Sequence, residues 1–87
     1  MELADIREQI DRIDKDITDL LQQRAKLAIQ AGILKKTMNR PIRDIVRERA
    51  VLAGLNDSKG PLSKIALRSI FNMIIQEMVT LEEDDTP

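Results

Sequence analysis

The sequence predicts an all-α fold with three helices per chain, one long, one short and one of medium length, paired as a homodimer. Three observations lead to this prediction. Apolar residues recur every three or four positions through the first third of the chain, no segment alternates in the manner of a strand, and proline occurs only at positions 41, 61 and 87. With 87 residues the chain is large enough for one domain, and association would help to stabilise it.

The first expected helix runs from Leu3 to Met38, and Gly32 is the only weak helix former near its end. Such a helix is roughly 50 Å long, whereas a compact chain of this length is only about 30 Å across. Either a second copy covers its apolar seam or the helix bends back. We expect a second copy, with the two long helices antiparallel. The seam has heptad-type spacing, with Arg24 in register between its apolar members: Leu3, Ile6, Ile10, Ile13, Ile17, Leu20, Leu27, Ala31 and Leu34.

Turn-forming residues divide the rest of the chain into two helices. Asp5 and Glu8 have the spacing of a capping box at the start of the first helix, and residues 39–41 end it, because the residue before a proline leaves the helical region. The second helix is expected from residues 42–44 to Leu55, and residues 56–61 form a turn.

The third helix is expected from Pro61 or Leu62 to about Glu82, with Phe71 in its buried stripe. The acidic end opposes the helix dipole and should fray. We therefore expect a helical domain over residues 1–83 and a flexible acidic tail over residues 84–87.

The composition excludes several kinds of function. Histidine and cysteine are absent, so the commonest general bases and metal ligands are missing, and we expect neither a metal nor another cofactor. A net charge of −1 and a single aromatic residue argue against nucleic-acid binding. No apolar run is long enough to span a membrane, and no signal peptide is evident, so a cytoplasmic location is the default. Any catalysis should depend on positioning and charge.

A guanidinium on an apolar seam is costly unless an anion meets it, although Arg24 alone could simply fix the register or reach solvent. Lys35 follows it by three helical turns on the same face. Arg7 lies roughly 25 Å away along the helix, so only an antiparallel partner's Arg7 could approach Arg24. Five further positions are candidates, and each alone is better explained by a surface ion pair, core packing or a solvated end: Asp44, Arg47, Glu48, Met78 and Glu82.

Taken together, these residues resemble the all-helical chorismate mutases, which are monofunctional or form the mutase domain of bifunctional shikimate-pathway enzymes. The similarity is strongest in the run RPIRDIVRER at residues 40–49, and it extends through residues 3–14, 20–28 and 70–75. The resemblance implies an intertwined dimer of three-helix chains. It also implies a cofactor-free [3,3] pericyclic rearrangement of the dianion chorismate to prephenate, in phenylalanine and tyrosine biosynthesis.

The resemblance also implies a role for each candidate residue. Arg24 and the partner chain's Arg7 would hold the substrate carboxylates, and Lys35 would bind the ether oxygen and a carboxylate. Glu48, with the backbone at Asp44, would bind the substrate hydroxyl, and Arg47 would order that side of the pocket.

The third helix departs from the family pattern at two positions. Met78 stands where a small hydroxyl residue commonly assists a carboxylate, which suggests modest substrate affinity. Glu82 stands where bacterial members have a glutamine that donates to the ether oxygen, and fungal members have a glutamate. Because a carboxyl group donates only when protonated, we expect the chemical step to be faster at mildly acidic pH.

Two other functions remain open from the sequence. An isochorismate-pyruvate lyase could use the same scaffold, and a non-catalytic helical dimer could use the same seam for regulation. Similar domains occur attached to dehydratases, dehydrogenases or an earlier pathway synthase. The sequence leaves open whether this chain is freestanding or belongs to such a fusion.

Overall fold

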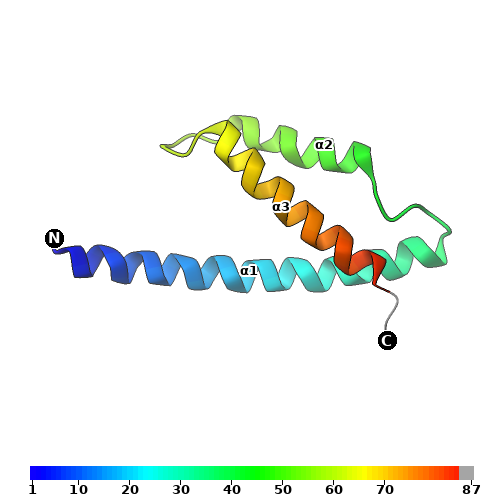
Figure 1. Ribbon diagram of the computed structural model, residues 1–87, viewed down its shortest axis with the longest axis horizontal. Helices are drawn as coiled ribbons and strands as arrows, with labels where there is room; N and C mark the ends of the chain where they lie inside the picture. Colours follow the sequence, from blue (N-terminus) through cyan, green and yellow to red (C-terminus); the bar gives the residue numbers. More distant parts are fainter. Residues whose placement is uncertain (85–87) are drawn as a thin grey trace.

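The computed structural model describes residues 1–84, and they form three α-helices. Helix α1 spans Leu3–Thr37, α2 spans Ile45–Gly54 and continues into a 3₁₀ turn, η1, at Leu55–Asp57, and α3 spans Lys64–Glu83. In Figure 1 α1 forms a long rod, α2 lies away from it, and α3 returns diagonally to cross α1 near its C-terminal end. The all-α prediction of one long, one short and one medium helix is confirmed.

Local hydrogen bonds explain where α1 begins and ends. Its capping box joins Glu2 and Asp5, and the backbone N–H of Glu2 donates to Asp5 Oδ2 over 3.0 Å. The predicted capping box from Asp5 to Glu8 is wrong by one turn, because Asp5 takes the third helical position. At the other end Asn39 has a φ of 55°, and the N–H groups of Asn39 and Arg40 donate to the carbonyls of Lys36 and Lys35. This Schellman motif reverses the chain immediately after the helix.

The two shorter helices begin one to three residues later than the sequence predicted. Asp44 caps α2 by accepting the N–H of Arg47 over 3.0 Å, and Ser63 caps α3 by accepting the N–H of Ala66 over 3.1 Å. A side-chain acceptor at each cap satisfies a backbone N–H that would otherwise lack a partner, so Ile42 and Pro61 stay outside the helices. Only the first residue of the expected acidic tail, Asp84, is described, and the others lie outside the described residues.

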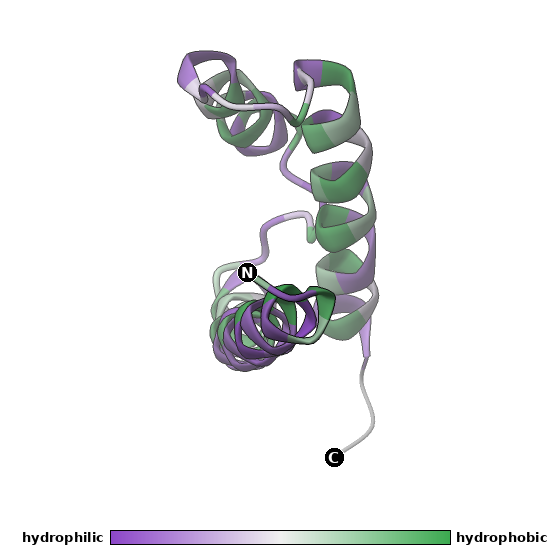
Figure 2. Cartoon of the chain, turned by 90° about the vertical axis from the view of Figure 1, so that its left-hand side faces the viewer, coloured by the Kyte–Doolittle hydropathy of each residue, from purple (hydrophilic) through white to green (hydrophobic). Residues whose placement is uncertain are grey.

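The core is small and lies where α3 crosses the C-terminal half of α1. Ala28 and Gly32 are buried on α1, opposite a buried set on α3 that comprises Ile75, Met78, Val79 and Glu82. Figure 2 shows hydrophobic residues recurring along α3 down to this crossing. Phe71, expected in the core, is half-buried. Small side chains on α1 allow the two helices to approach closely.

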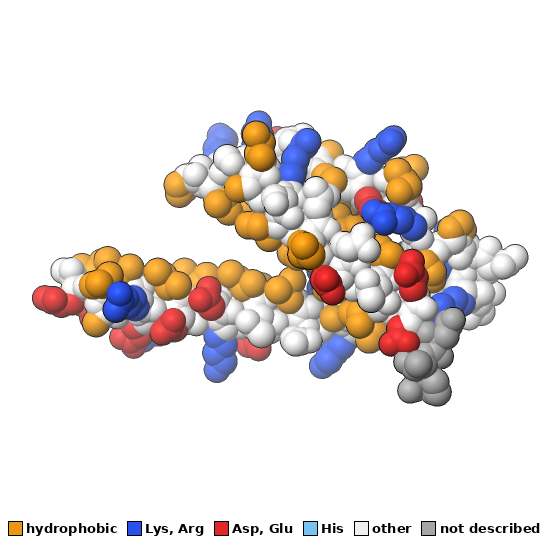
Figure 3. Space-filling view, in the orientation of Figure 1, with side chains coloured by type: hydrophobic (Ala, Val, Ile, Leu, Met, Phe, Trp, Pro, Cys, Tyr) orange, Lys and Arg blue, Asp and Glu red, His pale blue; other side chains and the backbone are white. Residues whose placement is uncertain are grey.

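The N-terminal half of α1 extends beyond this core. The radius of gyration is 16.1 Å and the extents are 55 × 30 × 14 Å, whereas a compact chain of this length would have a radius near 12 Å. Figure 3 shows a row of hydrophobic side chains along the projecting arm. Six large apolar residues of this arm are 40–62% exposed: Leu3, Ile6, Ile10, Ile13, Ile17 and Leu20. No described helix is long and apolar enough to cross a membrane.

Candidate active site

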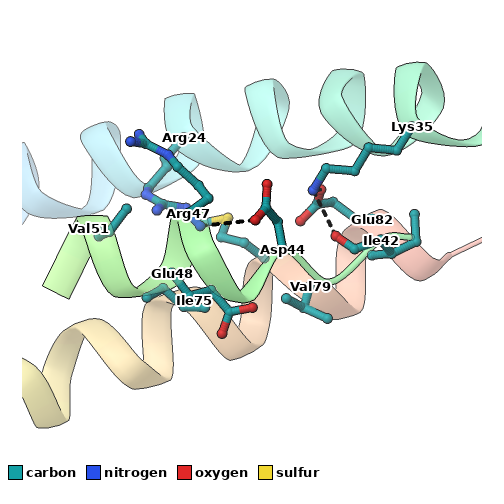
Figure 4. A pocket seen from close by; sticks show the side chains of 11 residues that line it. Arg24, Lys35, Ile42, Asp44, Arg47, Glu48, Val51, Ile75, Val79 and Glu82 are labelled. Atoms are coloured by element: carbon teal, nitrogen blue, oxygen red, sulfur yellow. Dashed lines mark hydrogen bonds and ion pairs between the residues drawn. The ribbon is translucent and has the colours of Figure 1, made fainter. Parts of the chain in front are cut away.

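A cavity of about 410 Å³, including its open mouth, lies between the C-terminal half of α1, the start of α2 and the end of α3. Figure 4 shows side chains from all three helices directed around it. Seven of the eight candidate residues from the sequence line this cavity: Arg24, Lys35, Asp44, Arg47, Glu48, Met78 and Glu82. The fold therefore brings residues from distant parts of the sequence to one place.

Two guanidinium groups line the cavity without a partner of their own. Arg24 comes from α1 and Arg47 from the first turn of α2, and Figure 4 draws the two side chains near one another at one end of the cavity. Within residues 1–84, neither guanidinium forms a hydrogen bond or ion pair. A ligand carboxylate would satisfy such donors, because arginine binds carboxylates with paired, charge-assisted hydrogen bonds.

The other end of the cavity holds a partly buried ion pair. Lys35 Nζ donates to Glu82 Oε1 over 2.5 Å and to the carbonyl oxygen of Ile42 over 2.8 Å. The Glu82 side chain is 9% exposed and the Lys35 side chain 24%. The lysine therefore joins α1, the loop before α2 and the last turn of α3 at one point, and it fixes where the Glu82 carboxyl group lies.

The two carboxylates of α2 are both engaged within the chain. Asp44 caps α2 through Oδ1. Glu48 accepts from Arg43 in a bidentate pair, with Nη2 to Oε1 at 3.0 Å and Nε to Oε2 at 3.1 Å. Arg43 also reaches Gln76 Oε1 on α3, over 3.4 Å. Glu48 must therefore exchange Arg43 for any ligand hydroxyl that it binds, or share its oxygens between the two.

Sequence reasoning missed several residues that shape the site. Arg43 belongs to the run at residues 40–49, but its pairing with Glu48 was not predicted, although the five-residue separation allows it. The Ile42 carbonyl has no signal in the sequence, because any residue offers the same acceptor. The apolar part of the lining also went unassigned to the site: Ile42, Val51, Ile75 and Val79.

Arg7 is the one candidate that the described chain does not bring to the cavity. It lies in the exposed N-terminal half of α1, seventeen residues before Arg24, which is roughly 25 Å along a helix. A single chain therefore leaves Arg7 outside the site, as the helix length alone predicted.

The lining offers cations, acceptors and a buried carboxyl group. Among the described residues it contains no Ser, Thr, Cys or His, and residues 1–84 hold no cluster of three or more potential metal-binding side chains. This arrangement can bind an anionic ligand, fix its conformation and stabilise charge that develops during a reaction.

Comparisons with known proteins agree with this geometry. A model of the family described as chorismate mutase type II matches residues 6–83. The chain is 36% identical over 84 residues to a bifunctional chorismate mutase/prephenate dehydratase of Buchnera aphidicola subsp. Schizaphis graminum, a match covering 94% of this chain and 22% of that protein. It is 39% identical over 87 residues to the protein of the same name from Aquifex aeolicus, with 94% and 24% covered. The chain thus spans about a quarter of the length of these relatives.

A solved structure is also similar over nearly its whole length. It is described as chorismate mutase (Form II) from Thermus thermophilus. The TM-score is 0.92 at 28% sequence identity, and the match covers 98% of each chain.

Proposed function

The chain belongs to the chorismate mutase type II family, and on that premise we propose that it catalyses the rearrangement of chorismate to prephenate. One observation carries the proposal. One cavity holds, at one end, two guanidinium groups that have no partner within residues 1–84 and, at the other, the partly buried pair of Lys35 and Glu82. Such a site fits a small dianion whose reaction needs hydrogen-bond donors beside the ether C–O bond that breaks.

The reaction is unimolecular, so the site only has to select a conformer and stabilise charge. The ether C–O bond of chorismate breaks as a new C–C bond forms, and negative charge builds on the ether oxygen. We propose that Arg24 holds one carboxylate and that Arg47 orders the same end of the cavity. Holding the chair-like conformer lowers the activation barrier by positioning the reacting atoms. Cations directed at the ether oxygen lower it further by stabilising the developing negative charge.

We propose that Lys35 and Glu82 act together on the ether oxygen. Lys35 Nζ has two acceptors in the free chain, Glu82 and the Ile42 carbonyl, and an ammonium group has three protons to donate. One proton therefore remains for the substrate. A protonated Glu82 would donate a second hydrogen bond to the same oxygen, whereas an ionised Glu82 would repel the developing charge.

Glu48 is proposed to accept the substrate hydroxyl, assisted by the backbone at Asp44. In the free chain Arg43 holds both Glu48 oxygens. The Glu48 side chain is 18% exposed and that of Arg43 is 50% exposed, so the arginine can move into solvent without losing a core contact. Met78 is buried at the cavity and offers only apolar contact and a weak acceptor to the substrate.

The site is proposed to be completed by a second copy of the chain. The exposed apolar row of α1 would be covered in an antiparallel dimer, which would bring the partner's Arg7 towards Arg24 and the second substrate carboxylate. The length of the helix, its exposed row and the distance of Arg7 from its own cavity support this arrangement.

The loss of chorismate absorbance tests the activity directly, with purified protein and no additives. We expect turnover by the parent and a fall in kcat/KM of about 100-fold or more in the variant Arg24→Ala, because the substrate carboxylate loses its charged partner. Arg12→Ala is the matched control, since Arg12 pairs with Glu8 at 2.7 Å on the exposed arm. A coupled assay for pyruvate released from isochorismate identifies a lyase. If neither assay detects turnover, the non-catalytic dimer is the remaining interpretation.

Two further predictions concern the setting of the domain. Because both bifunctional relatives named above carry a prephenate dehydratase, we propose that this domain works attached to or beside an enzyme that consumes prephenate. Co-purification of the native protein with dehydratase activity checks this. The cytoplasmic location and the domain limits of 1–83 stay predictions.

A further inference from the structure

The backbones of helices α1 and α3 approach each other closely at Gly32. A Cβ atom placed on Gly32 would lie 2.8 Å from the Cα of Glu82, 2.9 Å from its carbonyl oxygen and 3.1 Å from its Cβ. Two of these three atoms belong to the backbone of α3, which cannot turn aside as the end of a side chain can. Carbon atoms pack at about 3.5–4.0 Å, so a side chain on Gly32 would push this turn of α3 away by roughly 1 Å.

This contact occurs at the residue that carries the buried carboxyl group. Gly32 is buried, and Lys35 follows it by three residues on the same side of α1. Lys35 Nζ meets Glu82 Oε1 beside the cavity. The spacing of the two backbones at Gly32 therefore sets the position of Glu82 relative to Lys35.

We infer that Gly32 is a positioning residue for the rearrangement, and that its missing side chain lets Glu82 reach the ether oxygen together with Lys35. The inference rests on the proposed function. A displacement of about 1 Å at a catalytic group can reduce the rate about 100-fold. Arg24 lies two turns earlier on α1, so the hold on the carboxylate should change little.

A second glycine provides a matched control. Gly54 is the last residue of α2, and a Cβ placed there would meet nothing within 4 Å. Both glycines are helical and neither has a positive φ. Substituting alanine at each position therefore makes the same chemical change with and without a neighbouring backbone.

The experiment measures kcat and KM for chorismate in Gly32→Ala and Gly54→Ala, each made alone and together with Glu82→Ala. We expect Gly32→Ala to lower kcat by about 10- to 100-fold and to change KM by less than about threefold. We expect Gly54→Ala to keep the parent's kcat and an equal or higher Tm. In the Glu82→Ala background Gly32→Ala should lower kcat by less than about twofold, because the group that it displaces is gone.

Several results would overturn the inference. An undiminished kcat in Gly32→Ala would do so, as would an equal loss with and without Glu82, which would indicate a purely structural role. Gly32→Ala is also made in the Gly54→Ala background, which should be more stable. If this double variant still does not fold, Gly32 is needed for folding and the inference is wrong. If the parent itself does not turn over chorismate, the proposed function fails separately. A crystal structure of Gly32→Ala then decides, because an unchanged distance between Lys35 Nζ and Glu82 Oε1 contradicts the inference.

Discussion

The seam runs through both halves of α1, but only the C-terminal half has a face that this chain covers, beside the seam where α3 crosses. In the N-terminal half the seam residues are large and exposed, and Ile13, for example, is 57% exposed. In the C-terminal half the residues that meet α3 are small and buried, with Ala28 at 9% and Gly32 also buried. Small side chains therefore mark the face of α1 that this chain covers itself, whereas the large seam residues stay uncovered in both halves, with Leu27 at 64% and Leu34 at 60% exposed.

The physical reason lies in the distance between packed helices. Large aliphatic residues keep neighbouring helices about 8–10 Å apart and bury much apolar area, which suits association between two copies. Small residues allow a closer approach, and here that approach places the carboxyl group of α3 beside a lysine of α1. The cavity forms at the boundary, where Arg24 comes from α1 itself and another cation could come from a second copy.

The largest expected effect comes from placing a charge on the exposed seam. Ile13→Glu should dissociate the proposed dimer, since two symmetry-related carboxylates would be buried in it without partners. Activity should fall by more than about 100-fold, because each site loses the partner's Arg7. Sedimentation equilibrium together with the chorismate assay measures both effects.

Ile33→Glu is the control for this prediction. Ile33 is 59% exposed, nearly the same as Ile13, but it lies on roughly the opposite side of the helix. We expect it to stay dimeric, with stability within about 0.5 kcal/mol of the parent. If both variants stay dimeric or both dissociate, the comparison of seam and opposite face fails. The exposure of the residue, and not its position on the seam, would then determine the effect of a charge.

The second prediction uses two inactive variants to test which chain supplies Arg7. Arg7→Ala and Arg24→Ala should each be nearly inactive as homodimers. When they are unfolded, mixed in equal amounts and refolded, about half of the dimers are mixed, and each of these has one intact site if Arg7 acts across the dimer. About one quarter of the parental activity should return. No recovery would show that Arg7 does not serve the partner's site.

The seam, the three helices and the distance of Arg7 from its own cavity follow from sequence because they depend on periodicity and on helix rise. The helix starts at Asp44 and Ser63 were less predictable, since several polar residues nearby could serve as caps. The position of Arg43 against Glu48 and the approach at Gly32 could not be derived. They depend on how α2 and α3 are oriented relative to other elements, and a periodic pattern does not carry that information. Met78 and Glu82 reached the site through resemblance, and the geometry agrees with their placement.

The third prediction concerns the carboxyl group at the close crossing. If protonated Glu82 donates to the ether oxygen, kcat of the parent should fall as pH rises, by up to about tenfold per pH unit. Glu82→Gln donates at every pH and should give a flat profile over the same range. The pH dependence of kcat for both proteins measures this, with Glu83→Gln as the control on the exposed side of the same turn. Coincident profiles for the parent and Glu82→Gln would exclude Glu82 as the donor.

The smallest expected effect is a loss of stability in the C-terminal half of α1. Ala28→Leu adds three carbons where α1 is buried under α3, and overpacking of this kind costs about 1–3 kcal/mol. The helices cannot relax freely, because moving α3 outward would also stretch the pair of Lys35 and Glu82.

Ala4→Leu makes the same change at an exposed position on the side of α1 away from the seam, and it should stay within about 0.5 kcal/mol of the parent. Urea unfolding at one fixed protein concentration compares the two, since the stability of a dimer depends on concentration. Equal midpoints would mean that α3 can shift along or away from α1 at little cost, and the close approach at Gly32 would then not define the site.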